Sequence, residues 1–365
     1  MNQNPSHFHG SDLEKIAEKY RIPKESLVNF AANVNPLGLS GDVADKIAEN
    51  LQLISSYPDR EYTSLRKTIA AYCGVNMEHI IVGNGSSELI ALLIEQCFPK
   101  KTLVLGPTYS EYERELSFSS SAIEFYNLRS ENDFCLDVKD FADKLREGYD
   151  LLILCNPNNP TSSFIDNKTI EYLLECCKKH QTFVMIDETY VEFIPECAKV
   201  SSMSLVEKYD NLMVLRGVSK FFAAPGLRFG YGATSNLSFL EKMKNAQIPW
   251  SLNSIAAYAG ELMLVDKPYI LATKELIEKE KRQLLSELKK LSKVNVFPAY
   301  ANFILLQILA KNLSAADVFL ACLEEGLLIR DCSSFQNLDG EFLRFCIMNP
   351  GDNLRLLKIF AELLT

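Results

Sequence analysis

Short apolar runs of strand length alternate with longer stretches of helical length through roughly residues 79 to 250. Repetition of strand and helix is typical of a mainly parallel sheet covered by helices on both faces. The expected strands are 80–82, 102–105, 151–154, 182–186, 212–215 and 229–231. The expected helices between them include 88–97, 111–118 and 168–180.

The pattern changes after about residue 250. A charged and apolar stretch over 268–292 predicts one long helix, and short strands follow it. These strands are expected near 294–297, 303–306 and 343–347, with helices between and after them. We therefore expect a large α/β domain over 46–250 and a smaller α+β domain over 251–365, to which an N-terminal arm, 1–45, contributes. Because no repeat or flexible linker separates them, the two domains should pack together.

Composition limits the classes of function. The chain has 365 residues, of which 47% are hydrophobic, enough for one large core and one smaller core. A net charge of -9, with no cluster of five or more basic residues, argues against nucleic-acid binding. No apolar run approaches the roughly 18 to 20 residues of a membrane helix, and the N-terminus lacks an apolar signal core. We expect a cytoplasmic protein.

The ten cysteines are scattered, and several lie inside apolar helix or strand patterns, which favours reduced thiols. The four histidines form no metal-binding spacing with the cysteines or with one another. The sequence therefore predicts no metal site.

Polar side chains follow several of the expected strands. The strand at 151–154 leads into the sequence NPNNPT, the strand at 182–186 ends at Asp187 with Tyr190 three residues later, and the strand at 212–215 leads to Lys220. In open parallel sheets, ligands bind beyond the carboxyl ends of the strands, and these ends share one edge. We expect a binding site at that edge.

The residue types at this edge match one cofactor. An uncharged lysine such as Lys220 can form a Schiff base with an aldehyde, and Arg228 offers a bidentate fork to a phosphate. Pyridoxal phosphate carries both groups. A protonated pyridine nitrogen would pair with Asp187, and the amide of Asn159, fixed before Pro160, could donate to a phenolate oxygen. Taken singly, a solvated basic loop, an N-cap and an Asn-Pro turn each remain the more ordinary interpretation.

The sequence IIVGNGSSELIALLIEQC at 80–97 indicates a strand, a glycine turn and a helix whose first amides form an anion site. It nearly matches a dinucleotide fingerprint. However, Glu88 stands where the third glycine belongs, and no acidic residue follows the next strand. We therefore expect a single phosphate on Ser86 and Ser87. Tyr109, at another strand end, either stacks on a flat ring or is a buried core tyrosine.

Together, the segments GNGSSE, GPTY, NPNNPT, DETY and SKFFAAPGLRFG resemble fold-type I pyridoxal-phosphate enzymes, in the branch of histidinol-phosphate aminotransferases and threonine-phosphate decarboxylases. The resemblance spans nearly the whole chain. It implies that fold and pyridoxal 5'-phosphate as cofactor. Lys220 would be the Schiff-base lysine, Asp187 the partner of the ring nitrogen and Tyr109 the stacking ring, and these three would carry the catalysis. Asn159 and Tyr190 would bind the phenolate oxygen.

The resemblance also implies how anionic groups are held. The cofactor phosphate would be bound by Ser86, Ser87, Ser219 and Arg228, and by Tyr57 from the neighbouring subunit of a homodimer with shared active sites. The phosphate or carboxylate of the substrate would contact His9, Asn33, Arg330 and Arg344.

Four details resemble the decarboxylases more closely: a His-Gly pair at 9–10, FAANVNPLG at 30–38, QIPWSLN at 247–253 and AGE at 259–261. They imply decarboxylation of an O-phosphorylated amino acid, threonine phosphate or serine phosphate, to an amino-alcohol phosphate of the kind used in cobamide assembly. The alternative is an aminotransferase acting on histidinol phosphate or a related phosphorylated or phosphonate amine. A third hypothesis, a cofactor-binding regulator without turnover, ranks lower because no DNA-binding segment is appended.

Three positions depart from the family pattern. Gly217 replaces a hydroxyl residue three positions before the lysine, which predicts one phosphate contact fewer. Ser162 replaces a glycine after NPNNPT and should affect only the turn. Met348 stands where related decarboxylases have a second arginine, so the division of the substrate's anionic groups between sites is left open.

Overall fold

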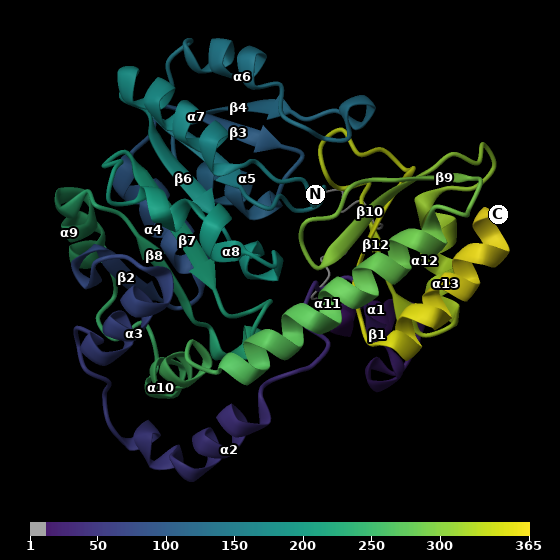
Figure 1. Cartoon of the computed structure of the whole chain (residues 1–365), viewed down its shortest axis with the longest axis horizontal. Helices are drawn as coiled ribbons and strands as arrows, with labels where there is room; N and C mark the ends of the chain where they lie inside the picture. Colours follow the sequence, from purple (N-terminus) through teal and green to yellow (C-terminus); the bar gives the residue numbers. More distant parts are fainter. Residues whose placement is uncertain (1–11) are drawn as a thin grey trace.

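The computed structural model describes residues 12–365, and its main element is a seven-stranded sheet. Figure 1 shows this sheet with helices around it and a smaller sheet beside it. The strand order is β2 (Ile80–Gly83), β8 (Gly230–Ala233), β7 (Leu212–Gly217), β6 (Phe183–Asp187), β5 (Leu151–Cys155), β3 (Lys101–Gly106) and β4 (Ala122–Asn127). From β7 to β4 neighbouring strands are parallel, whereas β8 is antiparallel to both β7 and β2.

Helices cover both faces of the large sheet, which confirms the predicted fold class. One hydrophobic core lies between the sheet and α4 (Ser86–Cys97), α5 (Ser110–Ser117) and α9 (Leu237–Ala246). The other core includes residues of α3 (Thr63–Cys73), α6 (Val138–Leu145) and α7 (Asn167–Lys179). Successive residues of one strand alternate between the cores, as Leu152 and Ile153 do in β5. A strand buried on both faces must be apolar throughout, which explains the continuous apolar runs.

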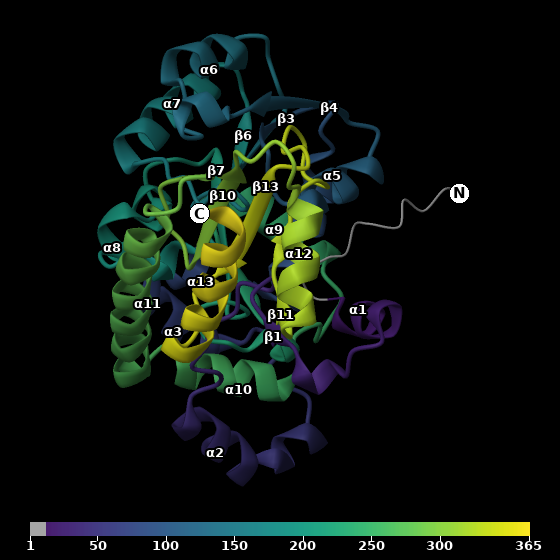
Figure 2. The ribbon, with the colours of Figure 1, turned by 90° about the vertical axis from the view of Figure 1, so that its right-hand side faces the viewer.

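The smaller sheet is antiparallel, in the order β12 (Arg330–Asp331), β13 (Phe342–Cys346), β10 (Phe303–Ile308) and β9 (Val294–Val296). Figure 2 shows α11 (Lys267–Leu288), α13 (Pro350–Leu364) and α12 (Ala315–Glu324) side by side across it. The long helix α11 ends at Leu288, four residues before the end predicted from its charge pattern.

The N-terminal segment forms part of a separate two-stranded sheet and also reaches the end of the large sheet. After α1 (Leu13–Tyr20), the short strand β1 (Val28–Asn29) pairs in parallel with β11 (Leu327–Leu328). A few residues later, the backbone N–H of Asn35 donates to the carbonyl of Lys220, 3.0 Å away, beyond the end of β7. The chain then continues into α2 (Gly41–Glu49), which packs on α10 (Ser254–Met263).

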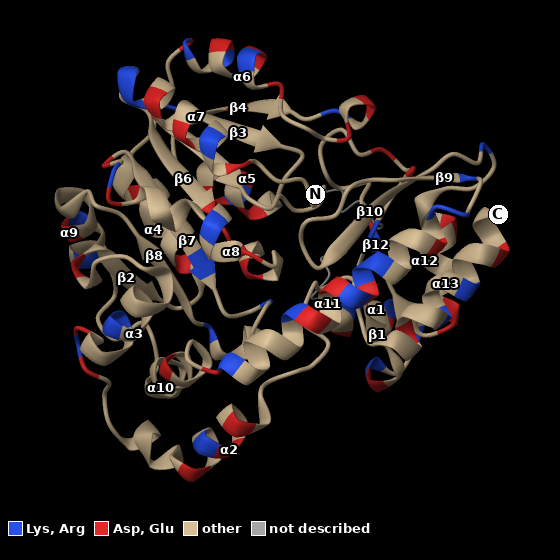
Figure 3. Ribbon diagram, in the orientation of Figure 1, with Lys and Arg blue, Asp and Glu red and all other residues tan. Residues whose placement is uncertain are grey.

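Charged residues lie mainly on the outer helices and loops, while the strands of the large sheet carry few (Figure 3). Within residues 12–365, no helix is both long and apolar enough to cross a membrane. The same part of the chain contains no group of three or more residues arranged as a metal site, and all ten cysteines are free thiols.

Candidate active site

A cavity of about 240 Å³ lies at the carboxyl ends of the parallel strands. It collects every predicted site residue except two. The predicted residues that line it are Asn33, Ser86, Ser87, Tyr109, Asn159, Asp187, Tyr190, Ser219, Lys220, Arg228, Arg330 and Arg344. His9 lies outside the described residues. Tyr57 lies on the surface, 80% exposed, with its ring 4.7 Å from the ring of Trp250.

Lys220 lies beyond the end of β7, and its ammonium group has a backbone partner. Its Nζ donates to the carbonyl oxygen of Ala32 at 2.6 Å. Burial, reinforced by the charges of Arg344 and Arg228, lowers the pKa of Lys220 to about 8. A substantial fraction of this amine is therefore neutral slightly above neutral pH, the form that a nucleophilic lysine requires.

Asp187 ends β6 and is buried in the wall of the cavity, with only 4% of its surface exposed. Its carboxylate accepts from the Tyr112 hydroxyl at 2.7 Å and from the backbone and hydroxyl of Thr189 at 2.9 and 2.6 Å. Burial raises the pKa of Asp187, and the three hydrogen bonds oppose that rise. Because these donors are neutral, the carboxylate is suited to a cationic ligand group such as a protonated ring nitrogen.

The start of α4 and the Arg228 guanidinium form an anion-binding corner. Ser86 and Ser87 begin the helix after Gly85, so the first amides of α4 face the cavity side of the sheet. A Cβ atom at Gly230 would lie 2.3 Å from the Ser86 nitrogen, so only glycine lets β8 approach the helix this closely. Glu88 accepts a hydrogen bond from the Asn84 nitrogen at 2.5 Å. The residue that departs from the dinucleotide fingerprint therefore holds the glycine turn in place.

Replacing Gly85 by alanine is expected to raise the Kd for pyridoxal phosphate by about tenfold or more. Gly85 has a φ of +83°, and a Cβ atom there would lie 2.5 Å from Nη2 of Arg228, so the guanidinium must move. Gly148→Ala is the matched control, because Gly148 has a φ of +78° but no heavy atom within 4 Å of an added Cβ. Titration of both apoenzymes with the cofactor checks the prediction. Equal affinities of the two variants would contradict it.

Gly217 lines the cavity beside Ser86. A Cβ atom at this position would lie 3.6 Å from Oγ of Ser86, an ordinary contact. The surroundings of Gly217 therefore have room for the Cβ atom of a larger residue. Ser86, Ser87 and Ser219 are serine residues that line the cavity with Gly217.

Arg330 and Arg344 face each other across neighbouring strands of the small sheet. Arg344 donates to Oδ1 of Asn159 and, at 2.6 Å, to the carbonyl of Ala31. Arg330 donates to Oγ of Ser334 at 2.7 Å. Burial and the adjacent Arg344 charge lower the pKa of Arg330 to about 10. Two adjacent guanidiniums whose acceptors are neutral oxygens form a strong site for anionic groups.

Asn33 lines the cavity and contacts Tyr190. It has a left-handed backbone, with φ +56°, and its Nδ2 donates to the hydroxyl of Tyr190 at 3.3 Å. Its buried Oδ1 has no hydrogen-bond partner among the described residues. Because a buried amide oxygen without a partner is costly, this atom is suited to a ligand donor.

The structure also accounts for the other two departures. Ser162 has a φ of +57°, which accounts for the glycine of the family pattern. The expectation that Ser162 affects only the turn is wrong, because its Oγ accepts a hydrogen bond at 2.9 Å from the nitrogen of Ala301, which is distant in the sequence. Met348 does not line the cavity, and its sulfur lies 3.5 Å from Sγ of Cys346. The residue at this position therefore adds no charge to the cavity.

Several residues of the site were missed by reasoning from the sequence. Tyr112 and Thr189 hold Asp187, and the carbonyls of Ala31 and Ala32 hold Arg344 and Lys220. The ETY sequence after Asp187 was a usable signal for Thr189, because a hydroxyl two residues after an aspartate commonly bonds back to it. No residue-type signal identifies a backbone carbonyl as a partner.

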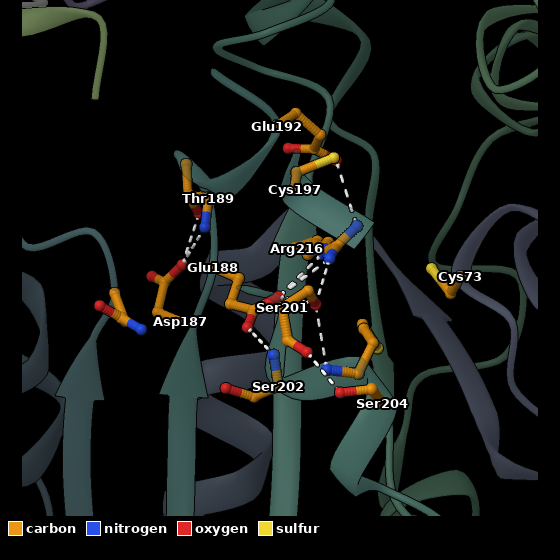
Figure 4. A network of polar contacts seen from close by, with 12 residues as sticks. Cys73, Asp187, Glu188, Thr189, Glu192, Cys197, Ser201, Ser202, Ser204 and Arg216 are labelled. Carbon is orange, nitrogen blue, oxygen red and sulfur yellow. Dashed lines mark hydrogen bonds and ion pairs between the residues drawn. The ribbon is translucent and has the colours of Figure 1, made fainter. Parts of the chain in front are cut away.

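A buried ionic network around Arg216 lies next to Asp187, which lines the cavity (Figure 4). Arg216 donates to Oε2 of Glu188 at 2.9 and 3.1 Å and to Oγ of Ser201 at 2.5 Å. Glu192 lies 3.7 Å from the same guanidinium. Glu188 directly follows β6, and Arg216 is the last residue but one of β7. The network therefore joins the ends of the two neighbouring strands that lead to Asp187 and Lys220.

Replacing Glu192 by glutamine is expected to remove part of the pH dependence of stability. Burial raises the pKa of Glu192 to about 7. The positive charge of Arg216 opposes this rise, and the negative charge of Glu188 adds to it. The folded state then binds more protons than the unfolded state between about pH 4.5 and pH 7, so stability falls as the pH rises through this window. At pH 8, Glu192→Gln should exceed the wild type by on the order of 2 kcal/mol.

Urea unfolding of the apoenzyme at pH 5 and pH 8 measures this difference. Glu95→Gln, on the exposed face of α4, is the control and should follow the wild type at both pH values. A Glu192→Gln variant that is less stable than the wild type at pH 8 would show that the Glu192 carboxylate is needed in its ionised form.

Comparison with known proteins finds one family model and relatives that are similar over nearly the whole chain. The family model Aminotransferase class I and II matches residues 25–360. The threonine-phosphate decarboxylase of Salmonella typhimurium is 31% identical over 98% of this chain and 96% of its own length. The histidinol-phosphate aminotransferase of Methanothermobacter thermautotrophicus is 31% identical over 100% of this chain and 96% of its own. The crystal structure of the histidinol-phosphate aminotransferase from Clostridium acetobutylicum has a TM-score of 0.85 and 32% identity, and covers 91% of this chain and 98% of that one.

Proposed function

The chain belongs to the class I and II aminotransferase family, and from that premise we propose that it is a decarboxylase of an O-phosphorylated amino acid, threonine phosphate or serine phosphate. The product would be an amino-alcohol phosphate, and pyridoxal phosphate is the cofactor. The observation that carries the proposal is the Arg330–Arg344 pair beside Lys220. Two adjacent cations are suited to a substrate with two anionic groups, a phosphate and a carboxylate. Similarity to a threonine-phosphate decarboxylase supports the same assignment.

The residues of the cavity fit the cofactor. The Asp187 carboxylate with its neutral donors suits the ring nitrogen, and the corner at Ser86, Ser87, Ser219 and Arg228 suits the phosphate. The oxygen of Asn159 is held by Arg344, which leaves its amide group to donate to the phenolate oxygen together with the hydroxyl of Tyr190. Tyr109 would stack on the ring. In a homodimer, the exposed Tyr57 would reach the phosphate bound by the other subunit.

Bound pyridoxal phosphate supplies an electron sink for the bonds at the α-carbon of an attached amino acid. The protein side chains that orient the substrate determine which of these bonds is aligned with that sink. We propose that Arg330 and Arg344 hold the phosphate and carboxylate so that the bond to the carboxylate is aligned. Oδ1 of Asn33 would accept a hydrogen bond from a donor group of the ligand. Lys220, with a pKa of about 8, would hold and deliver the proton that replaces the carboxylate.

One assay tests the proposal. Purified enzyme with pyridoxal phosphate and threonine phosphate or serine phosphate should release carbon dioxide and an amino-alcohol phosphate, without a keto acid. The control is the same reaction with histidinol phosphate and 2-oxoglutarate, in which we expect little glutamate to form. Glutamate formation with no release of carbon dioxide would refute decarboxylation.

Glutamate formation without release of carbon dioxide is the result expected of the alternative function, an aminotransferase. The similarity to histidinol-phosphate aminotransferases supports transamination of histidinol phosphate or a related phosphorylated or phosphonate amine. The same cations would then bind the phosphate of the amine and the carboxylates of the amino-group donor in turn. Lys220 would move a proton to and from the α-carbon.

A further inference from the structure

Tyr112 lines the cavity and contacts two of its other residues, Asp187 and Tyr109. It is fully buried on the inner side of α5, four residues before the buried Leu116. Its hydroxyl donates to Oδ2 of Asp187 at 2.7 Å, and its ring meets the ring of Tyr109 edge-on, with centroids 5.5 Å apart. Neither the sequence motifs nor the proposed function assigns a role to this residue.

The hydrogen bonds of Asp187 are divided between its two oxygens. Oδ1 accepts both donors of Thr189, whereas Oδ2 accepts the hydroxyl of Tyr112 (Figure 4 shows the Thr189 contacts). Because Asp187 is buried, it would tend to take up a proton, and hydrogen bonds to the charged form oppose this. Burial also raises the pKa of Tyr112 well above its usual value, so its hydroxyl remains a donor throughout the working range of pH.

We propose that Tyr112 is a positioning residue whose hydroxyl keeps Asp187 ionised and oriented toward the cofactor ring. The inference rests on the proposed role of Asp187 as the partner of the ring nitrogen. An ionised Asp187 holds the proton on that nitrogen, whereas a neutral carboxyl does not. Tyr112 would therefore set the lowest pH at which the cofactor is bound in its protonated form.

The substitution Tyr112→Phe tests this without disturbing the packing, because the ring and its contact with Tyr109 are retained. The measurement is the Kd of the apoenzyme for pyridoxal phosphate as a function of pH, which requires no turnover. In the wild type, affinity falls as the pH drops through the pKa of Asp187. Without the Tyr112 hydroxyl the carboxyl takes up its proton more readily, so this fall should move upward by about one pH unit.

Two further arms separate the hydroxyl from a general structural effect. Tyr149→Phe is the matched control, because Tyr149 is also buried and its hydroxyl donates to Glu124 at 2.8 Å, away from the cavity. It should leave the pH profile unchanged. A cofactor analogue with C–H in place of the ring nitrogen has no proton to share with Asp187. The affinity of the apoenzyme for this analogue should rise as the pH drops through the same range. Tyr112→Phe should move the rise upward by the same number of pH units.

Asp187→Asn distinguishes failure of the inference from failure of the proposed function. If Asp187→Asn leaves the affinity and its pH profile unchanged, Asp187 does not bind the ring nitrogen and the proposed function loses this contact. If Asp187→Asn removes the pH dependence while Tyr112→Phe retains the wild-type profile, the role of Tyr112 is refuted. A shift in Tyr112→Phe that is absent from Tyr149→Phe supports the inference.

Discussion

Lys220→Ala is expected to lower kcat by about 10⁴-fold or more, the largest effect of any single substitution in this chain. The amine at this position is the only one in the described part of the chain that lines the cavity. It would both attach the cofactor and move the proton, and loss of a positioned acid or base alone costs up to about 10⁴-fold. Steady-state rates with the phosphorylated amino acid measure the effect.

The covalent link to the cofactor gives a second measurement. Borohydride reduction of the wild type, followed by peptide mass spectrometry, should place the cofactor on Lys220, whereas Lys220→Ala should yield no reduced adduct. Lys274→Ala is the control, because Lys274 lies outside the cavity and donates to the carbonyl of Pro195 at 3.1 Å. A reducible adduct in Lys220→Ala would refute the assignment of this lysine.

Arg344→Lys should lower kcat/KM by about 100-fold, mainly through a higher KM. The guanidinium holds Asn159 and the carbonyl of Ala31 at the same time, and an ammonium group cannot reach both while also binding a substrate anion. Loss of one partner in a buried, charge-assisted contact costs about 2 to 5 kcal/mol, and each 1.4 kcal/mol corresponds to a factor of ten.

The kinetic parameters identify how Arg344 acts. Arg282→Lys, on the exposed side of α11, conserves the charge in the same way and should behave as the wild type. If Arg344→Lys keeps the wild-type KM but loses affinity for the cofactor, the arginine acts through Asn159 and not on the substrate. A kcat/KM within threefold of the wild type would contradict both roles.

The large sheet could be predicted from the sequence because its central strands are apolar throughout. The run at 151–154 has this character because β5 is buried on both faces. The edge strand β4 (Ala122–Asn127) was missed, since its exposed and half-buried residues interrupt the apolar pattern. The antiparallel direction of β8 could not be predicted, because hydrophobic periodicity carries no information about strand direction.

The residues of the site that could be predicted from the sequence are those that follow a recognisable strand. Asp187 and Lys220 lie at or just beyond strand ends, and parallel pairing brings these ends together. Tyr112 was not predicted, because its role depends on the rotation of α5 against the sheet, which only the packed structure defines. The resemblance to the pyridoxal-phosphate family is confirmed by the family model, while the division of substrate contacts stays a prediction.

The contact between Arg344 and Ala31 joins residues 313 positions apart in the sequence. The parallel strands β1 and β11 are separated by a similar length of sequence. During synthesis on the ribosome, the large sheet can form once β8 has emerged, but its cavity then lacks the strand that carries Arg344. The pair of guanidiniums is therefore completed only by β13, the last strand of the chain, after every strand of the large sheet has emerged.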